Sequence, residues 1–150
     1  MSVQTHGHQL ALRAFEDLKI SLLYIPGRVW AVDWRVSKLR QFIDEKNGCI
    51  GYRLTDICRQ LDLGISASHA SRLFHQDMGV AIREYMKLKR LQTAAVKLQT
   101  TSMSVKEIAA DLGYQTPADL FRQFKGFFQI TPLTFRSLSR THPAFNQIVA

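Results

Sequence analysis

The side chains that most often carry catalysis or bind metal ions are few in this sequence, and they are scattered. The histidines stand at positions 6, 8, 69, 75 and 142, and no pair of them has the spacing of a metal site or a catalytic triad. The two cysteines, Cys49 and Cys58, have a spacing typical of neither a metal site nor a disulfide framework. We therefore expect a protein that is not an enzyme, with no catalytic residues, no bound metal and no cofactor.

Side chains that could bind a polyanion are abundant instead. Lys and Arg number 20 against 12 Asp and Glu, which gives a formal net charge of +8 at pH 7. A small basic domain is predisposed to nucleic acid, anionic lipid or acidic proteins. The hydrophobic content of 46% is enough for a folded core. Charge alone does not select among these partners, so the choice depends on where the arginines and lysines lie.

An arginine follows a glycine-containing turn in the segment from Lys106 to Lys125, KEIAADLGYQTPADLFRQFK. Apolar residues recur at helical spacing on both sides of Gly113, which interrupts them. Two short helices joined by such a turn form a helix-turn-helix, and Gly113 tolerates the positive φ that the turn needs. Leu120 and Phe124 would then pack inward. The outward face of the second helix holds Pro117, Ala118, Phe121, Arg122 and Lys125.

The residue types on this outward face suit a groove of duplex DNA. A helix fits the major groove of B-DNA, where arginine can bind guanine through two hydrogen bonds and an apolar group can meet a thymine methyl. Arg122 is the candidate for the guanine contact. Phe121 has two interpretations: a partner surface covers it, or it packs on Phe127 or Phe128 as part of the core.

The same arrangement occurs earlier in the chain with a more polar outward face. Ser66 can cap a helix in which Ala70 points inward. Ser68, Ser71 and Arg72 then lie at positions equivalent to the outward face of the second copy. These side chains could contact bases or phosphates, and for the serines a solvated helix face is the alternative.

Helical periodicity extends over most of the chain, and we find no candidate for a strand longer than a few residues. The expected fold class is all-α, with two helix-turn-helix subdomains joined by a long linker helix, plus a short N-terminal extension. We expect an N-terminal extension at 1–33 with a helix at 10–24, a DNA-binding domain at 34–140, and a C-terminal tail at 141–150. Within the DNA-binding domain, the first helix-turn-helix is expected at 54–76, the linker helix at 80–99 and the second helix-turn-helix at 104–127.

The expected linker helix carries two stripes of side chains. Its apolar stripe is typical of a helix packed on a core, and its largely separate basic stripe holds Arg83, Lys87 and Arg90. We expect these three to lie in solvent or to contact phosphates, although a polybasic helix can also bind an anionic membrane. About 20 residues at 1.5 Å each make a rod of roughly 30 Å, which would place the two outward-facing helices about one turn of DNA apart.

Several motifs occur in a fixed order between Trp34 and Arg136. They include ISASHASRLFHQDMG, then IREYMKLKRLQTAAVKL, then SVKEIAADLGYQTPADLFRQFKGFFQITPLTFR from Ser104 onward. The last segment resembles the second helix-turn-helix and carboxyl-terminal signature of AraC/XylS-type transcriptional regulators, and the resemblance extends upstream through the other two. The sequence departs from that family at Gln129, where glycine is usual before the dipeptide TP.

The resemblance implies seven helices in two subdomains, each of which places one recognition helix in adjacent major grooves of an asymmetric promoter site. By position, it implies base contacts from Ser68, Ser71, Arg72, Pro117, Ala118, Phe121 and Arg122. It also makes Lys125 and Arg136 candidates for contacts to the DNA backbone, beside Arg83, Lys87 and Arg90 of the linker. The expected function is that of a sequence-specific double-stranded DNA-binding transcription regulator.

The expected partners are double-stranded DNA, bound by a monomer, and RNA polymerase. The alternative is a helix-turn-helix protein that acts mainly through protein partners such as RNA polymerase or another regulator. No apolar run reaches the roughly 18 residues needed to cross a bilayer, and MSVQTHGHQL is no signal peptide, so we expect a cytoplasmic protein without membrane contact. Residues 1–33 are too short for an independent core, so the chain resembles the small stand-alone members of the family or a fragment of a longer regulator.

Overall fold

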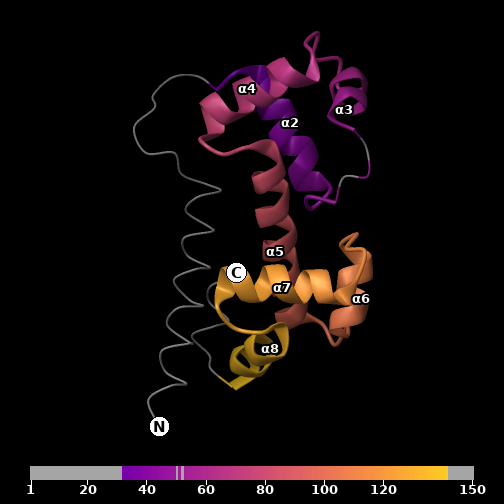
Figure 1. Cartoon of the computed structure of the whole chain (residues 1–150), viewed down its shortest axis with the longest axis vertical. Helices are drawn as coiled ribbons and strands as arrows, with labels where there is room; N and C mark the ends of the chain where they lie inside the picture. The colour runs from indigo at the N-terminus through magenta and orange to yellow at the C-terminus, as the bar shows by residue number, and fades with distance from the viewer. Residues whose placement is uncertain (1–31, 50, 52, 142–150) are drawn as a thin grey trace. The chain divides into compact units, whose positions relative to one another are not determined.

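The computed structural model describes residues 32–49, 51 and 53–141, which form a series of α-helices (Figure 1). The helix expected over 10–24 lies outside the described residues. Within the described residues there are seven helices and no strand, so the predicted all-α fold class is confirmed. The helices are α2 (Trp34–Glu45), α3 (Leu54–Gln60), α4 (Ala67–Met78), α5 (Ile82–Thr100), α6 (Val105–Asp111), α7 (Pro117–Phe128) and α8 (Pro132–Thr141).

The chain divides into two compact units, and the division falls inside α5, the longest of the described helices. The N-terminal unit contains α2, α3, α4 and the part of α5 up to Arg90. The C-terminal unit contains the rest of α5, from Leu91, together with α6, α7 and α8. Helices α3 and α4 span 54–78, α5 spans 82–100, and α6 and α7 span 105–128, whereas the sequence analysis expected the corresponding segments at 54–76, 80–99 and 104–127.

The N-terminal unit is built around apolar side chains that recur at helical spacing. Val36, Leu39 and Ile43 on α2 are each 1% exposed, and Phe74 of α4 is fully buried. The Phe74 ring packs edge-to-face on Tyr85 of α5, with 5.4 Å between the ring centroids. These contacts hold α2, α4 and the start of α5 together.

A polar contact also joins α2 and α5 within this unit. The Tyr85 hydroxyl donates a hydrogen bond of 2.9 Å to a carboxylate oxygen of Asp44, and Lys89 forms an ion pair of 3.0 Å with the same oxygen. Burial, followed by the hydrogen bond to Asp44, raises the pKa of Tyr85. The phenol therefore stays neutral and keeps its proton for the hydrogen bond.

The C-terminal unit has the turn chemistry that its sequence predicts. The Ser104 side chain accepts the Glu107 N–H while the Glu107 carboxylate accepts the Ser104 N–H, so these two residues form a capping box at the start of α6. Gly113, just after α6, has φ +70, as a tight turn requires. Thr116 then caps α7, whose first residue is Pro117.

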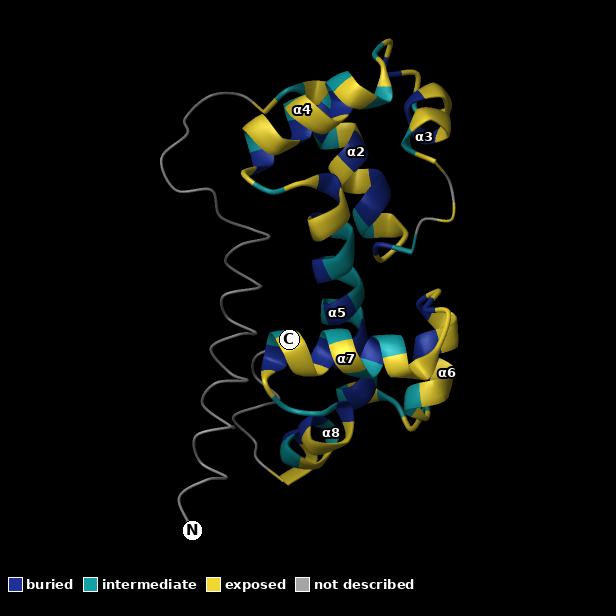
Figure 2. Cartoon of the chain, in the orientation of Figure 1, coloured by how far each residue is buried: buried dark blue, intermediate teal, exposed yellow. Residues whose placement is uncertain are grey.

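The core of the C-terminal unit is largely aromatic. Leu120, Phe124 and Phe128 of α7 are fully buried, and Phe135 of α8 is 1% exposed. The Phe124 ring lies 4.3 Å from that of Phe128 and 5.4 Å from that of Phe135. This packing leaves the opposite side of α7 exposed, as the alternation of buried and exposed residues shows (Figure 2).

The two units repeat the same caps. Ser66 and Thr116 are the N-caps of α4 and α7, and Gly79 and Gln129 end those helices in the left-handed conformation. Gln129 adopts φ +60 although it is not glycine, so its departure from the family pattern leaves backbone strain at this turn. The Gln129 amide group donates a hydrogen bond of 2.7 Å to the carbonyl oxygen of Gly126.

The repeat continues beyond these caps. Counted from the two N-caps, Ile82 at the start of α5 corresponds to Pro132 at the start of α8, and the buried Tyr85 corresponds to the buried Phe135. The start of α5 therefore takes, in the N-terminal unit, the place that α8 takes in the C-terminal unit. Between these caps and the starts of α5 and α8, residues of one unit therefore have counterparts in the other.

Candidate nucleic-acid interface

The outward face of α7 holds five residues that the sequence predicts to contact DNA. Four of them are exposed and Phe121 is half-buried, whereas Leu120 and Phe124 between them are fully buried. All five border one open groove of about 710 Å³. The groove is lined by Ser104, Val105, Pro117, Ala118, Phe121, Arg122, Lys125, Leu133 and Arg136.

Phe121 belongs to the wall of this groove. Among the described residues it takes part in no aromatic ring pair, while Phe127 and Phe128 pair with each other at 5.0 Å. The interpretation that Phe121 packs on those rings is therefore not what the structure shows. Its half-buried ring instead presents apolar surface beside Ala118 and Arg122.

Arg122 extends from the same face and is held by a neighbour on its own helix. Its side chain is 76% exposed, and its guanidinium forms an ion pair with Asp119, whose side chain is 29% exposed. The other carboxylate oxygen of Asp119 accepts a hydrogen bond of 2.8 Å from the Thr116 hydroxyl. The Thr116 oxygen also accepts the Asp119 N–H at 3.2 Å. The N-cap of α7 thus orients Asp119, and Asp119 orients Arg122.

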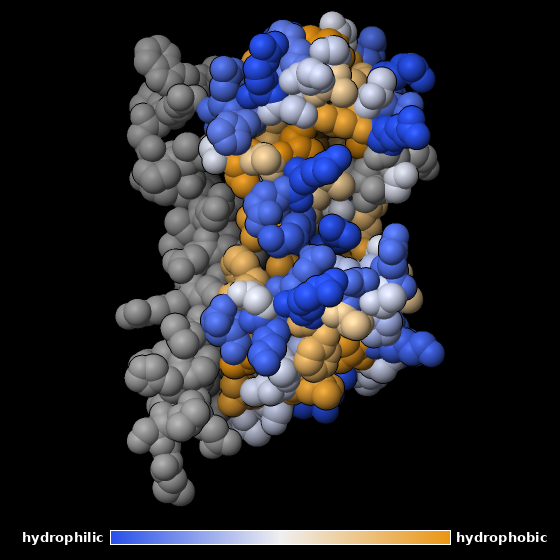
Figure 3. Space-filling model, viewed as in Figure 1, coloured by the Kyte–Doolittle hydropathy of each residue, from blue (hydrophilic) through white to orange (hydrophobic). Residues whose placement is uncertain are grey.

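Three further residues of the groove were not among the sequence predictions. Ser104 and Val105 come from the start of α6, and Leu133 comes from the first turn of α8. Leu133 is 58% exposed, which is unusual for a large apolar side chain that lies beside other apolar groups. Figure 3 shows hydrophobic surface between hydrophilic side chains on the C-terminal unit.

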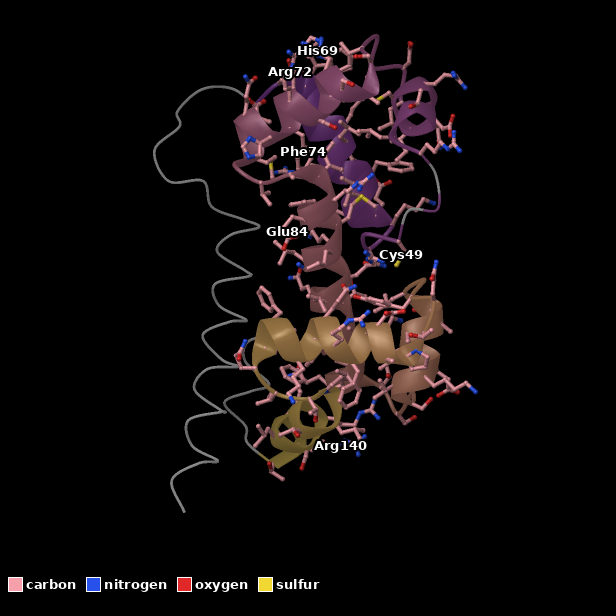
Figure 4. The ribbon with its side chains drawn as sticks, in the orientation of Figure 1. Cys49, His69, Arg72, Phe74, Glu84 and Arg140 are labelled. Atoms are coloured by element: carbon pink, nitrogen blue, oxygen red, sulfur yellow. The ribbon has the colours of Figure 1, made fainter. Side chains whose placement is uncertain are left out.

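The corresponding face of the N-terminal unit is polar. Ser68, Ser71 and Arg72 are exposed on α4, while Phe74 is buried. Figure 4 shows Arg72 on the outer side of α4 and Phe74 pointing inward. Ser71 borders a groove of about 460 Å³ that also includes Arg53 and Arg83. The structure therefore brings together two predicted contact residues, Ser71 and Arg83, and adds Arg53, which the sequence analysis did not select.

The predicted contacts to the DNA backbone have different surroundings. Arg83 and Lys125 are exposed, and Arg90 is half-buried. Lys87 is half-buried and forms an ion pair of 2.8 Å with Glu84. The Arg136 guanidinium donates a hydrogen bond of 3.2 Å to the carbonyl oxygen of Leu98 and a second hydrogen bond to the carbonyl oxygen of Met103.

Arg136 thus ties α8 to the end of α5 and to the loop that precedes α6. Its predicted contact with the DNA backbone remains a prediction, as do the predicted contacts of Arg83, Lys87, Arg90 and Lys125. Arg83 and Lys125 are the two whose exposure suits that role best.

Over residues 32–49, 51 and 53–141, no group of three or more His, Cys, Asp and Glu side chains could hold a metal ion. In the same part of the chain, no helix has the length and apolar character of a membrane span.

Two helix-turn-helix units, each with an arginine on the exposed face of its second helix, define a tandem helix-turn-helix protein. The family model described as "Helix-turn-helix domain" matches residues 61–137, which is more than half of the chain. The chain belongs to the AraC-type helix-turn-helix family of transcription regulators, as its sequence indicated.

Two relatives are named as a transcriptional activator and a probable transcription factor. The chain is 35% identical over 104 residues to the HTH-type transcriptional activator RhaR of Mannheimia succiniciproducens, a match that covers 68% of this chain and 37% of the relative. It is 38% identical over 73 residues to the probable transcription factor PqrA of Proteus vulgaris, covering 49% of this chain and 60% of that one. The chain therefore spans less than two thirds of the length of these relatives.

A solved structure shows the same fold. The DNA-binding domain of the global transcriptional factor AdpA, determined in complex with a target DNA, matches with a TM-score of 0.65. The match is 19% identical and covers 73% of this chain and 96% of that domain. At this identity the likeness shows the fold alone.

Proposed function

We propose that this chain is a sequence-specific double-stranded DNA-binding transcription regulator, which inserts α4 and α7 into adjacent major grooves near a promoter. The observation that carries the proposal is the exposed face of α7, where the 76% exposed Arg122 is oriented by Asp119 above an apolar groove. An arginine held in one orientation can pair with the two acceptors of guanine in the major groove.

The surrounding charge supports the same proposal. The chain has a formal net charge of +8, and the exposed Arg83 and Lys125 lie on or beside the two grooves. Phosphate contacts supply much of the affinity of DNA-binding proteins, while base contacts supply selectivity. We propose that Arg83, Lys87, Arg90, Lys125 and Arg136 serve the backbone.

The base contacts would come from both recognition helices. Those of α4 are assigned to Ser68, Ser71 and Arg72, and those of α7 to Pro117, Ala118, Phe121 and Arg122. In this proposal one chain binds one site as a monomer in the cytoplasm, and RNA polymerase is the protein partner that makes the bound regulator effective.

The test is selection of bound duplexes from a random library, followed by measurement of affinity for the selected duplex and for scrambled DNA over a series of salt concentrations. An asymmetric motif with two blocks about 10 base pairs apart is the expected result. If no sequence is enriched and the affinity for DNA depends steeply on salt concentration, the protein binds DNA through its basic surface without sequence specificity. No binding at all would favour the alternative, in which the protein acts mainly through protein partners.

A further inference from the structure

We propose that the C-terminal unit recognises the methyl groups of thymine, beside a guanine bound by Arg122, and that the N-terminal unit does not. This inference rests on the proposed function, because it concerns which base pairs α7 prefers. Three features of the structure support the inference. They are the apolar lining of the C-terminal groove, the different residues at equivalent positions of the N-terminal groove, and the charged side chains at the rim of the C-terminal groove.

The lining of the C-terminal groove leaves few groups that could form hydrogen bonds with bases. Five of its side chains have neither a donor nor an acceptor: Val105, Pro117, Ala118, Phe121 and Leu133.

The polar side chains of the same lining are largely committed elsewhere. Ser104 is bonded to Glu107, and the Arg136 guanidinium is bonded to backbone carbonyls. Two polar side chains of the lining keep donors for a partner: Lys125, and Arg122, whose guanidinium uses only part of its donors in the ion pair with Asp119. The remaining five lining side chains are apolar.

An apolar lining has one good partner in the major groove. The C5-methyl of thymine is the apolar group that a base pair exposes there, whereas adenine and cytosine expose amino donors. An amino group pressed against the apolar wall would lose its water without gaining a new hydrogen bond, which is unfavourable. The groove should therefore favour thymine at the positions that Phe121 and Ala118 cover.

The N-terminal unit supplies a comparison within the same molecule. By the correspondence of the two units, Phe121 is replaced by Ser71 and Leu133 by Arg83. Both Ser71 and Arg83 line the equivalent groove, as does Arg53. The rest of that lining is apolar: Leu39, Ile43, Ile57 and Ile82, which are buried, and Leu54, Ala81 and Met86. The contrast between the two grooves therefore lies at the positions of Phe121 and Leu133, where the N-terminal unit has a hydroxyl and a guanidinium group. Hydroxyl and guanidinium groups can bind the polar edges of bases or phosphates, and they gain nothing from a methyl group. The preference for thymine methyl groups should therefore be confined to one half of the site.

The charges around the C-terminal groove suit a duplex. Arg122 is 76% exposed at its edge, and the exposed Lys125 lies on the same face of α7. An apolar floor with cations at the rim is complementary to a methyl-bearing base edge flanked by phosphates. Burial of one methyl group contributes about 0.8 kcal/mol, which corresponds to about fourfold in affinity.

The experiment removes only the methyl group. In the duplex selected by the full chain, each thymine is replaced in turn by deoxyuridine, and the dissociation constant is measured. The block that belongs to α7 is identified as the one whose base preference Arg122→Ala relaxes. We expect about a fourfold loss of affinity when one or more thymines of that block are replaced by deoxyuridine. Replacement of thymines in the other block should leave the affinity unchanged.

Two protein variants test which side chains are responsible. Leu133→Arg and Phe121→Ser install the residues that stand at the equivalent positions of the N-terminal unit. Leu133 is 58% exposed, so Leu133→Arg should leave the fold intact. Phe121→Ser removes a half-buried ring, and its thermal unfolding is compared with that of the unchanged chain. In both variants, replacing thymine by deoxyuridine in the α7 block should change the dissociation constant little or not at all.

The outcomes separate this inference from the proposed function. A selected site with no thymine in the α7 block, or with no thymine there that is sensitive to deoxyuridine, overturns the inference and leaves the proposed function standing. Equal sensitivity in both blocks also overturns it. A chain that selects no sequence removes the proposed function, and the inference falls with it.

Discussion

Arg122 and Asp119 show how a charged pair on a helix surface can matter for recognition more than for stability. The Arg122 side chain is 76% exposed, and an exposed ion pair of this kind adds little to folding. Near DNA, however, an unpaired carboxylate would repel the phosphates, and a free guanidinium would have to lose rotational freedom on binding. In the proposed complex the ion pair would reduce both costs, because the guanidinium offsets part of the Asp119 charge and Arg122 is already oriented.

Replacement of Arg122 by alanine should reduce selective binding. We expect Arg122→Ala to lose about 1–3 kcal/mol of binding free energy on the selected duplex and far less on scrambled DNA, because a contact to guanine is lost. Fluorescence anisotropy titrations with both duplexes measure the two losses. The matched control is Arg83→Ala, which should weaken binding to both duplexes alike and lower the salt slope by about 1. Equal losses for Arg122→Ala would make Arg122 a phosphate contact.

Replacement of Asp119 by asparagine separates orientation from charge. Asp119→Asn keeps an acceptor for the Thr116 hydroxyl but removes the ion pair with Arg122. Binding to scrambled DNA should become tighter because a negative charge leaves the interface, while the preference for the selected duplex should fall severalfold. The midpoint of thermal unfolding should change little. An unchanged preference would show that Asp119 does not orient Arg122 for base recognition.

At the scale of elements, α4 and α7 end in the same left-handed backbone conformation but with different residues. Gly79 and Gln129 both adopt the left-handed conformation, at φ +69 and φ +60. Glycine adopts it without a steric penalty, whereas a residue with a side chain pays about 1–2 kcal/mol. The hydrogen bond from the Gln129 side chain to Gly126 offsets part of this penalty.

Two substitutions should therefore change stability in opposite directions. Gln129→Gly should raise the free energy of unfolding by up to about 1 kcal/mol, since it removes the strain of the left-handed conformation at the expense of one exposed hydrogen bond. Gly79→Ala should lower it by about 1 kcal/mol, because an added Cβ meets no atom within 4 Å and the effect is conformational. Denaturant titrations of both variants measure these changes. A less stable Gln129→Gly variant would show that the side-chain hydrogen bond outweighs the strain.

The start of α2 should make stability depend on acid pH. Asp33 caps this helix, and the hydrogen bond from the Arg35 side chain, followed by that from the Arg35 N–H, lowers the pKa of Asp33 to about 2. A carboxyl whose pKa is lowered in the folded state stabilises the fold at pH values above its ordinary pKa of 3.8. That stabilisation is lost as the pH falls to about 2, the pKa of Asp33 in the folded chain.

Asp33→Asn should remove this part of the pH dependence. The variant should be less stable than the unchanged chain at pH 5, and the difference should narrow as the pH falls from 4 to 2, because the unchanged chain loses the charge that the variant lacks. Thermal unfolding midpoints of both proteins at each pH give the comparison. A constant difference between the two proteins across this range would contradict the assignment.

The elements were largely predictable because the features that define them act locally. Glycine at a left-handed turn, as at Gly113, and the capping box of Ser104 with Glu107 depend on neighbours a few residues away. The role of Leu133 was missed because it lies on α8 and meets the α7 face only through tertiary packing. Asp119 was missed although its spacing from Arg122 carried the signal, since acidic and basic residues three positions apart on a helix are neighbours.

Charge is also predictable from sequence, but what each charge is bonded to is not. The sequence assigned Arg136 to the DNA backbone because of its type and position. In the structure its guanidinium binds the carbonyl oxygens of Leu98 and Met103, which come from segments far away along the chain. Only the packing of α8 against the end of α5 brings these groups together.

For the whole molecule, the decisive property is that its two similar units carry different contact faces. The face of α4 is polar, with Ser71 and Arg72, whereas that of α7 combines Arg122 with apolar groups. A symmetric dimer of a single helix-turn-helix reads the same half-site twice and requires a palindrome. In the proposed mode of binding, a chain with two different units should read an asymmetric site without a second copy.

The expected complex therefore contains one chain for each duplex. Sedimentation or native mass measurement on the selected duplex should give a ratio of one to one at concentrations well above the dissociation constant. Arg72→Ala should relax the base preference of one block only, and Arg122→Ala that of the other only, because each arginine belongs to a separate unit. Two chains on a palindromic site, with both substitutions relaxing the same bases in each half, would mean that a single unit reads the DNA. The other unit would then act as an anchor on the backbone or as a surface for a partner protein.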